Sequence, residues 1–212
     1  MLGAAMVLFP LLKHMYLGLA PVVAGLGASA VLLYRPVRRR LTAALMAPAR
    51  KRFLLVLVVL AIVLRVGYCV AFQRAPRSDQ RFYHTAAVDM LDGKGYLYQG
   101  GQATAFYPPG NSMRLAAWYA VTTPHYLSGW AMNILLGGLL VLLGYAFCAR
   151  EISEKVARWT ALLLAVHPVA LASSGGLGYE TALSCLLMGV FLLALRVGRG
   201  RGTMSNVAAL VA

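Results

Sequence analysis

Long apolar runs alternate with short basic segments along most of this chain. Four runs approach the length of about 20 residues with which an α-helix crosses a bilayer: residues 53–73, 130–149, 156–174 and 177–195. An earlier run, 15–34, contains Pro21 and several glycines. The residues after Thr203 begin another apolar run, which is too short to cross when the chain stops at Ala212. The pattern predicts an all-α polytopic transmembrane helix bundle, and the last run indicates the N-terminal part of a longer protein or a truncated product.

The basic residues gather at the ends of these runs and predict the topology. They concentrate in residues 35–52, 150–158 and 196–201, and lysine and arginine favour the cytoplasmic side of a membrane. Residues 74–114 then form an outer loop. We therefore divide the chain into an N-terminal apolar segment with a basic stretch (1–52), a transmembrane region (53–195), and a cytoplasmic turn with the start of a span (196–212).

Composition narrows the class of partner. The chain is 60% hydrophobic and only 12% charged, with a formal charge of +14. In a soluble protein such a charge would indicate nucleic acid, but the basic residues here are explained by topology, so no nucleic-acid partner is expected. The expected location is the cell (inner or plasma) membrane, crossed several times. The three cysteines lie in or beside apolar runs without a CxxC pair, which favours packed thiols over a disulfide or zinc site.

The outer loop contains a helix signature. After Ser78, a suitable N-cap, apolar residues recur at helical spacing, and Asp92-Gly93 is a typical stop. The spacing predicts a helix over residues 79–92, lying on the outer membrane surface with its apolar face down. Asp79 falls in the first turn, where it either supports the cap or takes a proton from an acceptor hydroxyl.

Further candidates flank this helix. Tyr107 begins a stiff Tyr-Pro-Pro-Gly corner that directs the chain back towards the membrane, and this tyrosine can also face a sugar. Glu180, at the outer end of the fourth span, is either functional or an exposed rim carboxylate. Arg65 lies inside the first span and either snorkels outward or binds a lipid phosphate. The basic residues of the loop suit an anionic lipid or phosphate: Arg74, Arg77, Arg81 and Arg114.

The order and spacing of several segments resemble a known family. They are LRVGY, SDQRFYHTAAVDMLDGKGY, TAFYPPGNSMRLAAWYA, and the stretch from Asn133 to Leu183. Over residues 53–195 they resemble multi-spanning glycosyltransferases of the C superfamily, nearest the protein O-mannosyltransferase and aminoarabinose-transferase group. The resemblance implies transfer of a sugar from a polyprenyl-phosphate carrier to a lipid, glycan or protein acceptor on the outer face.

The resemblance also implies roles for individual residues. The family's catalytic base in the first outer loop matches Asp79, and Glu180 matches an acidic residue at the outer start of the fourth span. Some members have two adjacent acids where this chain has Asp79-Gln80, so a metal site is left open. The family's later spans and C-terminal domain are absent from these residues.

The sequence therefore predicts a membrane glycosyltransferase with a lipid-phosphate sugar donor. Its catalytic residue is Asp79, and its expected substrate-binding residues are Glu180, Arg65, Arg74, Arg81, Tyr83 and Tyr107. No cofactor is assigned, and a divalent cation is left open. The alternatives are a transporter or flippase-like subunit, which would place ionisable groups near the midplane, and a non-catalytic truncated remnant.

Overall fold

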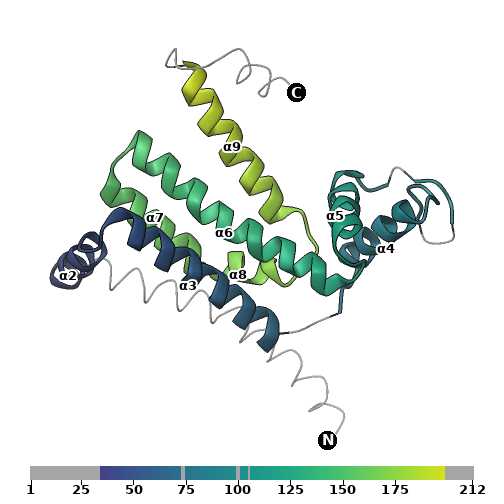
Figure 1. The fold of residues 1–212 in the computed structure, drawn as a ribbon, viewed down its shortest axis with the longest axis horizontal. Helices are drawn as coiled ribbons and strands as arrows, with labels where there is room; N and C mark the ends of the chain where they lie inside the picture. Colours follow the sequence, from purple (N-terminus) through teal and green to yellow (C-terminus); the bar gives the residue numbers. More distant parts are fainter. Residues whose placement is uncertain (1–33, 73–74, 99–100, 105, 199–212) are drawn as a thin grey trace, which may run out of the picture. The chain divides into compact units, whose positions relative to one another are not determined.

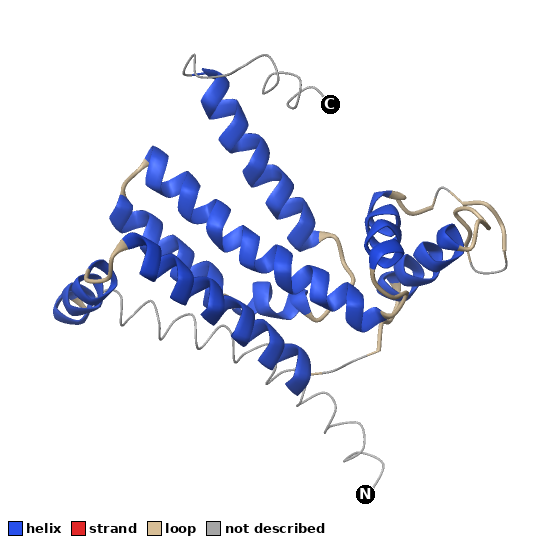
Figure 2. Ribbon diagram, viewed as in Figure 1, coloured by secondary structure: helices blue, strands red, loops and turns tan. Residues whose placement is uncertain are grey.

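The computed structural model describes residues 34–72, 75–98, 101–104 and 106–198 (Figure 1). The regular structure in these ranges is helical, apart from one isolated antiparallel bridge between Leu97 and Ala103 (Figure 2). The chain divides into two compact units, Met1–Ala49 and Arg50–Ala212. In the first unit the described helix is the basic α2, Arg35–Met46, which has a proline in its first turn.

Three described helices of the second unit are long and apolar enough to cross a membrane. They are α3 (Arg50–Ala71), α6 (Tyr126–Glu151) and α9 (Glu180–Gly198). A fourth crossing is possible if α7 (Glu154–Val166) and α8 (Pro168–Ser174) form one span with a bend of 52°. Each of the four spans predicted after residue 52 thus coincides with a helix or a helix pair, which confirms the all-α class for the described residues and helices long and apolar enough to cross a membrane. The apolar runs 15–34 and 203–212 lie outside the described residues.

The third predicted span is interrupted at Pro168. Proline has no backbone N–H, so the Leu164 carbonyl, four residues earlier, lacks its usual helical donor. Arg65 of α3 supplies replacements: Nη2 donates to the Leu164 oxygen at 3.4 Å and Nη1 to the Ala165 oxygen at 3.3 Å. His167 caps the helix beyond the break, because its Nδ1 accepts the Ala170 N–H at 3.4 Å.

Arg65 also determines how closely α3 can approach α6. Its side chain is fully buried, and Nη1 makes a further bond of 3.0 Å to the Ala61 oxygen of its own helix. The guanidinium lies against Gly137 of α6 so tightly that a Cβ there would overlap Nε. The absence of a side chain at Gly137 therefore lets α3, α6 and α7 meet around one cation.

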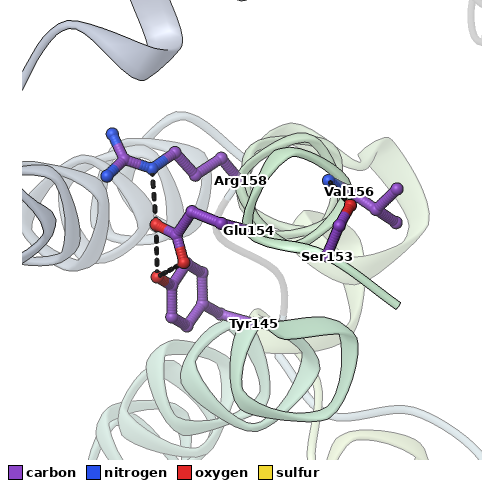
Figure 3. Close-up of polar contacts among 5 residues, drawn as sticks. All are labelled: Tyr145, Ser153, Glu154, Val156 and Arg158. Atoms are coloured by element: carbon purple, nitrogen blue, oxygen red, sulfur yellow. Dashed lines mark hydrogen bonds and ion pairs between the residues drawn. The ribbon is translucent and has the colours of Figure 1, made fainter. Parts of the chain in front are cut away.

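A second polar cluster fixes the turn between α6 and α7 (Figure 3). The Ser153 hydroxyl accepts the Val156 N–H at 3.3 Å, as an N-cap should. Glu154 accepts the Tyr145 hydroxyl and the Arg158 Nε at 2.7 Å each on Oε1. This cluster secures one end of the bundle, away from the acidic candidates of the outer loop.

The outer loop folds into a helical hairpin. Helix α4 spans Asp79–Leu91 and is followed by Gly93 at φ +74°, so the predicted helix and its stop are confirmed. Its apolar face packs against α5, Gly110–Val121, in a shared core with Leu115 and Tyr119. The face that the sequence prediction gave to the membrane surface is thus largely covered by protein. Residues 122–125 separate α5 from α6, so α5 does not extend the second span.

Candidate functional site

Asp79 is an exposed carboxylate held by two hydroxyl groups. Its Oδ1 accepts the Tyr107 phenol at 2.8 Å and the Ser78 hydroxyl at 2.8 Å. Ser78 occupies the predicted N-cap position but makes no side-chain capping bond. Its φ is +48°, the one positive φ of a non-glycine residue among the described ranges, and such a conformation is strained and concentrates at functional sites. The serine therefore orients Asp79 rather than capping α4.

Packed aromatic rings bring Tyr107 to Asp79. The Tyr107 ring lies 4.7 Å from that of Phe82 and 5.7 Å from that of Tyr83, centroid to centroid. Its carbonyl accepts the Tyr96 hydroxyl at 3.0 Å. The corner predicted to turn the chain thus also fixes a phenol donor on the carboxylate.

The two partners shift each other's protonation. The hydrogen bonds from Tyr107 and Ser78 lower the pKa of Asp79, because they stabilise its charged form. The same bond to Asp79 raises the pKa of Tyr107 to about 12. At neutral pH Asp79 is therefore an ionised acceptor, and Tyr107 remains its donor.

Glu180 acts on the same region. The pKa of Tyr83, one turn after Asp79 on α4, is raised first by burial and then by the charge of Asp79, with smaller contributions that include Glu180. Glu180 is exposed at the start of α9, and its carboxylate folds back over Gly178. Gln80 of α4 also contacts this turn, near Gly176. The charges of Asp79 and Glu180 thus both act on Tyr83, while their placement on one membrane face stays a prediction.

Arg114 and two asparagines join α5, α6 and the turn before α9. Arg114 donates to the Asn111 Oδ1 at 2.6 Å, to the Asn133 Oδ1 at 3.0 Å and to the Gly178 oxygen at 3.1 Å. The amide of Asn111 donates to the Leu177 oxygen at 2.9 Å, and that of Asn133 to the Gly176 oxygen at 2.6 Å. The sequence prediction counted Arg114 only among the basic loop residues and missed both asparagines. The sequence could have indicated Asn133 as a functional candidate, because it is a polar residue inside an apolar span.

The other predicted arginines do not converge on Asp79. Arg65 neither snorkels nor faces the loop; it is buried among helix carbonyls, because the break at Pro168 leaves acceptors that it satisfies. Arg81 is exposed and lines a separate hollow of about 460 Å³ with Thr85 and Tyr98. Two positions along a helix differ by roughly 200°, which places Arg81 on another face of α4 from Asp79. Arg74 lies outside the described residues.

No ligand set for a metal emerges from this geometry. Within the described residues, no three side chains of histidine, cysteine, aspartate or glutamate converge. Comparisons of the chain with models of protein families, with curated proteins and with solved structures give no match. A functional proposal therefore depends on the site geometry itself.

Proposed function

We propose that this chain forms the acceptor-activating part of a membrane glycosyltransferase that takes its sugar from a polyprenyl-phosphate carrier. The observation that supports this most is the state of Asp79. One carboxylate oxygen is fixed by two hydroxyl donors, and Oδ2 has no donor from another described residue. The carboxylate is exposed and ionised, at the end of a strongly apolar bundle. Such a group can receive a proton from a hydroxyl that approaches from water or from the membrane surface.

The proposed reaction is a single displacement. The hydroxyl of a lipid, glycan or protein acceptor donates a hydrogen bond to Asp79, and its oxygen attacks the anomeric carbon. The bond between that carbon and the phosphate oxygen breaks, the phosphate keeps the electron pair, and the acceptor proton passes to Asp79. Because the pKa of Asp79 is lowered, proton transfer becomes favourable only as the acceptor oxygen gains positive charge near the transition state.

Charge develops on the leaving phosphate, which requires a cation nearby. Arg65 was a sequence candidate for this role, but its bonds to carbonyl oxygens point it elsewhere. Arg114 is the better candidate. It donates to the Gly178 oxygen, and the charge of Glu180 acts both on Arg114 and on Tyr83, which lies one turn after Asp79. Glu180 would position the sugar or the acceptor.

Replacement of Asp79 by asparagine tests the proposal. Asp79→Asn keeps the shape and the hydroxyl contacts but cannot take the proton, so transfer should fall by about 10²- to 10⁴-fold. The measurement is transfer of a radiolabelled sugar from a polyprenyl phosphate in membranes with matched expression. The control is Asp92→Asn, an exposed carboxylate beside the end of α4 that pairs with Lys94 instead, and it should retain activity. Unchanged transfer in Asp79→Asn would contradict the role of the base.

A transporter is the second candidate, favoured by one observation. Broken helices and buried ionisable groups are typical of transporters. Here the helix break at Pro168 lies next to the buried Arg65, which donates to the Leu164 oxygen. An accessible substrate site would need donors that face it, whereas the Nη atoms of Arg65 donate to protein carbonyls and its unpartnered Nε is buried against Gly137. Carrier-dependent uptake of a sugar lipid into vesicles, without covalent transfer, would favour this candidate over the enzyme.

A further inference from the structure

Helix α2 brings positive charge into a unit of the chain that has no acidic residue. Its sequence, RPVRRRLTAALM, contains four arginines, and residues 1–49, which form this unit, contain no aspartate or glutamate. Arg38, Arg39 and Arg40 are exposed. The ion pairs found within the described residues involve Lys94 or Arg158 and none of these three arginines. The charge of α2 is therefore left for water or for an anionic partner.

The arginines also lie at the end of α2 where the helix dipole disfavours them. All four occur in the first six residues of a helix of 12 residues. The N-terminus of a helix has a partial positive charge, so nearby cations destabilise the helix and nearby anions stabilise it. The first turn holds no acidic residue, and the N-cap residue Tyr34 makes no side-chain capping bond. A negatively charged surface beside α2 would offset this repulsion.

One side of α2 is apolar. Successive residues of an α-helix differ by about 100° in direction, so residues three and four positions apart share a face. Four apolar residues fall on one face in this way and form the apolar stripe: Val37, Leu41, Ala44 and Leu45. Leu41 is 39% exposed, and Ala44 is exposed as well. A basic helix with such a stripe is typical of a helix that lies in a membrane interface.

The three consecutive arginines have different places around this stripe. Arg38 and Arg40 flank it, at about 60° and 100° from Leu41 on opposite sides. Arg39 lies on the far side, about 160° from Leu41. If the stripe faces acyl chains, the long side chains of Arg38 and Arg40 can extend to the phosphates beside it, whereas that of Arg39 faces water.

The chain itself keeps α2 at the membrane. Three residues, Ala47–Ala49, separate the end of α2 from Arg50, where the candidate span α3 begins. Four peptide steps extend to about 14 Å at most. The end of α2 is therefore held within reach of the headgroup layer at that end of α3. A soluble acidic protein or a nucleic acid would have to compete there with a lipid surface that is always adjacent.

We propose that α2 lies in the headgroup layer at the N-terminal end of α3 and binds anionic phospholipids. The apolar stripe faces the acyl chains, and Arg38 and Arg40 bind the phosphates. Attraction to an anionic surface falls off within a Debye length, about 8 Å at physiological ionic strength. A helix with its side chains is about 10–12 Å wide, so Arg39 on the far side contributes less. This inference is independent of the proposed glycosyl transfer.

Two positions of α2 allow a matched test. Leu41 lies in the apolar stripe, and Ala43 is exposed about 200° away. A cysteine at either position, Leu41→Cys or Ala43→Cys, is labelled with the fluorophore NBD, whose emission rises when it leaves water. The three native cysteines are buried, and the wild-type chain labelled in the same way gives the blank. The full chain is placed in nanodiscs of dioleoyl phosphatidylcholine, alone or with a third of it replaced by dioleoyl phosphatidylglycerol.

The expected result depends on both the position and the lipid. The label at position 41 should leave water in the discs that contain phosphatidylglycerol, and it should stay in water in phosphatidylcholine alone. The label at position 43 should stay in water in both. Raising the salt concentration from about 0.1 M to about 1 M shortens the Debye length from about 10 Å to about 3 Å, so it should return the label at position 41 to water.

Substitution of the arginines tests their places around the stripe. Arg38→Gln and Arg40→Gln should each weaken the docking of α2 about fivefold, because a basic residue near an anionic surface contributes roughly that factor. Arg39→Gln is the control and should weaken docking less than about twofold, since it lies farther from the surface. Glutamine and arginine have similar helix propensities, so α2 should persist in all three variants.

Each opposite result would overturn the inference. A label at position 41 that stays in water beside phosphatidylglycerol would show that α2 does not dock. The same shielding in phosphatidylcholine alone, or at position 43, would show that protein covers the helix or that apolar attraction alone holds it. Equal losses in the three glutamine variants would reject the orientation of the stripe. Because no sugar transfer is measured, failure of the proposed function leaves these results unaffected.

Discussion

Adjacent glycines of α6 should respond in opposite ways to the same substitution. Glycine inside a helix is usually less favourable than alanine by about 1 kcal/mol, so Gly→Ala normally stabilises. At Gly138 the added Cβ would lie 3.7 Å from Ile62 Cγ1, an ordinary contact. We expect Gly138→Ala to be neutral or stabilising by up to about 1 kcal/mol.

At Gly137 the same methyl group meets Arg65. It would overlap Nε and lie 2.8 Å from Cδ, so the side chain must move. Arg65 is fully buried, and its bonds to Ala61, Leu164 and Ala165 fix the guanidinium. Overpacking costs about 1–3 kcal/mol, and one lost bond from a charged donor about 1.5–3 kcal/mol. After the helix-propensity gain of about 1 kcal/mol, Gly137→Ala should destabilise by roughly 1.5–5 kcal/mol.

Thermal unfolding of the two variants in one detergent measures this difference. The decisive result is the sign of each change in stability, because the two positions lie in the same helix, are both buried and receive the same substitution. A double variant, Gly137→Ala with Arg65→Met, should be less destabilised than the sum of its single variants, since methionine can yield space. If Gly137→Ala melts at or above Gly138→Ala, the packing of Arg65 against α6 is wrong.

Two further predictions concern Asp79 and the helix break. Tyr107→Phe removes a donor that lowers the pKa of Asp79, so this pKa should rise, and transfer should be lost at a higher pH than in wild type as the assay is acidified; an unshifted acid limb of the pH–rate profile would contradict the contact. Pro168→Ala restores an N–H for the Leu164 carbonyl, so Arg65→Met should destabilise this background less than wild type in the same melting assay; equal losses in both backgrounds would reject the compensation.

Much of the helical layout could be predicted from the sequence. Span lengths and the basic flanks identified α3, α6 and α9, because apolar length is a local property of the chain. The start and stop of α4 were equally local, and Asp79–Leu91 differs from the predicted range by one residue at its end. Pro168 also predicts an interrupted helix, but the sequence does not show which donor the free Leu164 carbonyl receives, because that donor comes from α3.

Contacts between distant segments could not be predicted in the same way. The bond between Asp79 and Tyr107 joins residues 28 positions apart, and it depends on how the rings of Phe82 and Tyr83 pack. The amphipathic pattern of α4 showed that one face is covered, but not that α5 provides much of the cover. Periodicity reports that a face avoids water and does not identify what lies against it.

The buried Arg65 and the half-buried Arg114 show why charge alone does not identify a site. Each lies in an apolar setting without an acidic partner among the chain's six carboxylates. The Nη atoms of Arg65 satisfy carbonyls that the helix break leaves without donors, while its Nε is buried without a hydrogen-bond partner. Arg114 is held by neutral amides and a carbonyl, and its last donor faces a sulfur atom in the lining of an apolar groove. The hydrogen bonds of Arg114 connect α5, α6 and the turn before α9, whereas those of Arg65 lie at the break between α7 and α8, so both arginines have positions that the fold requires.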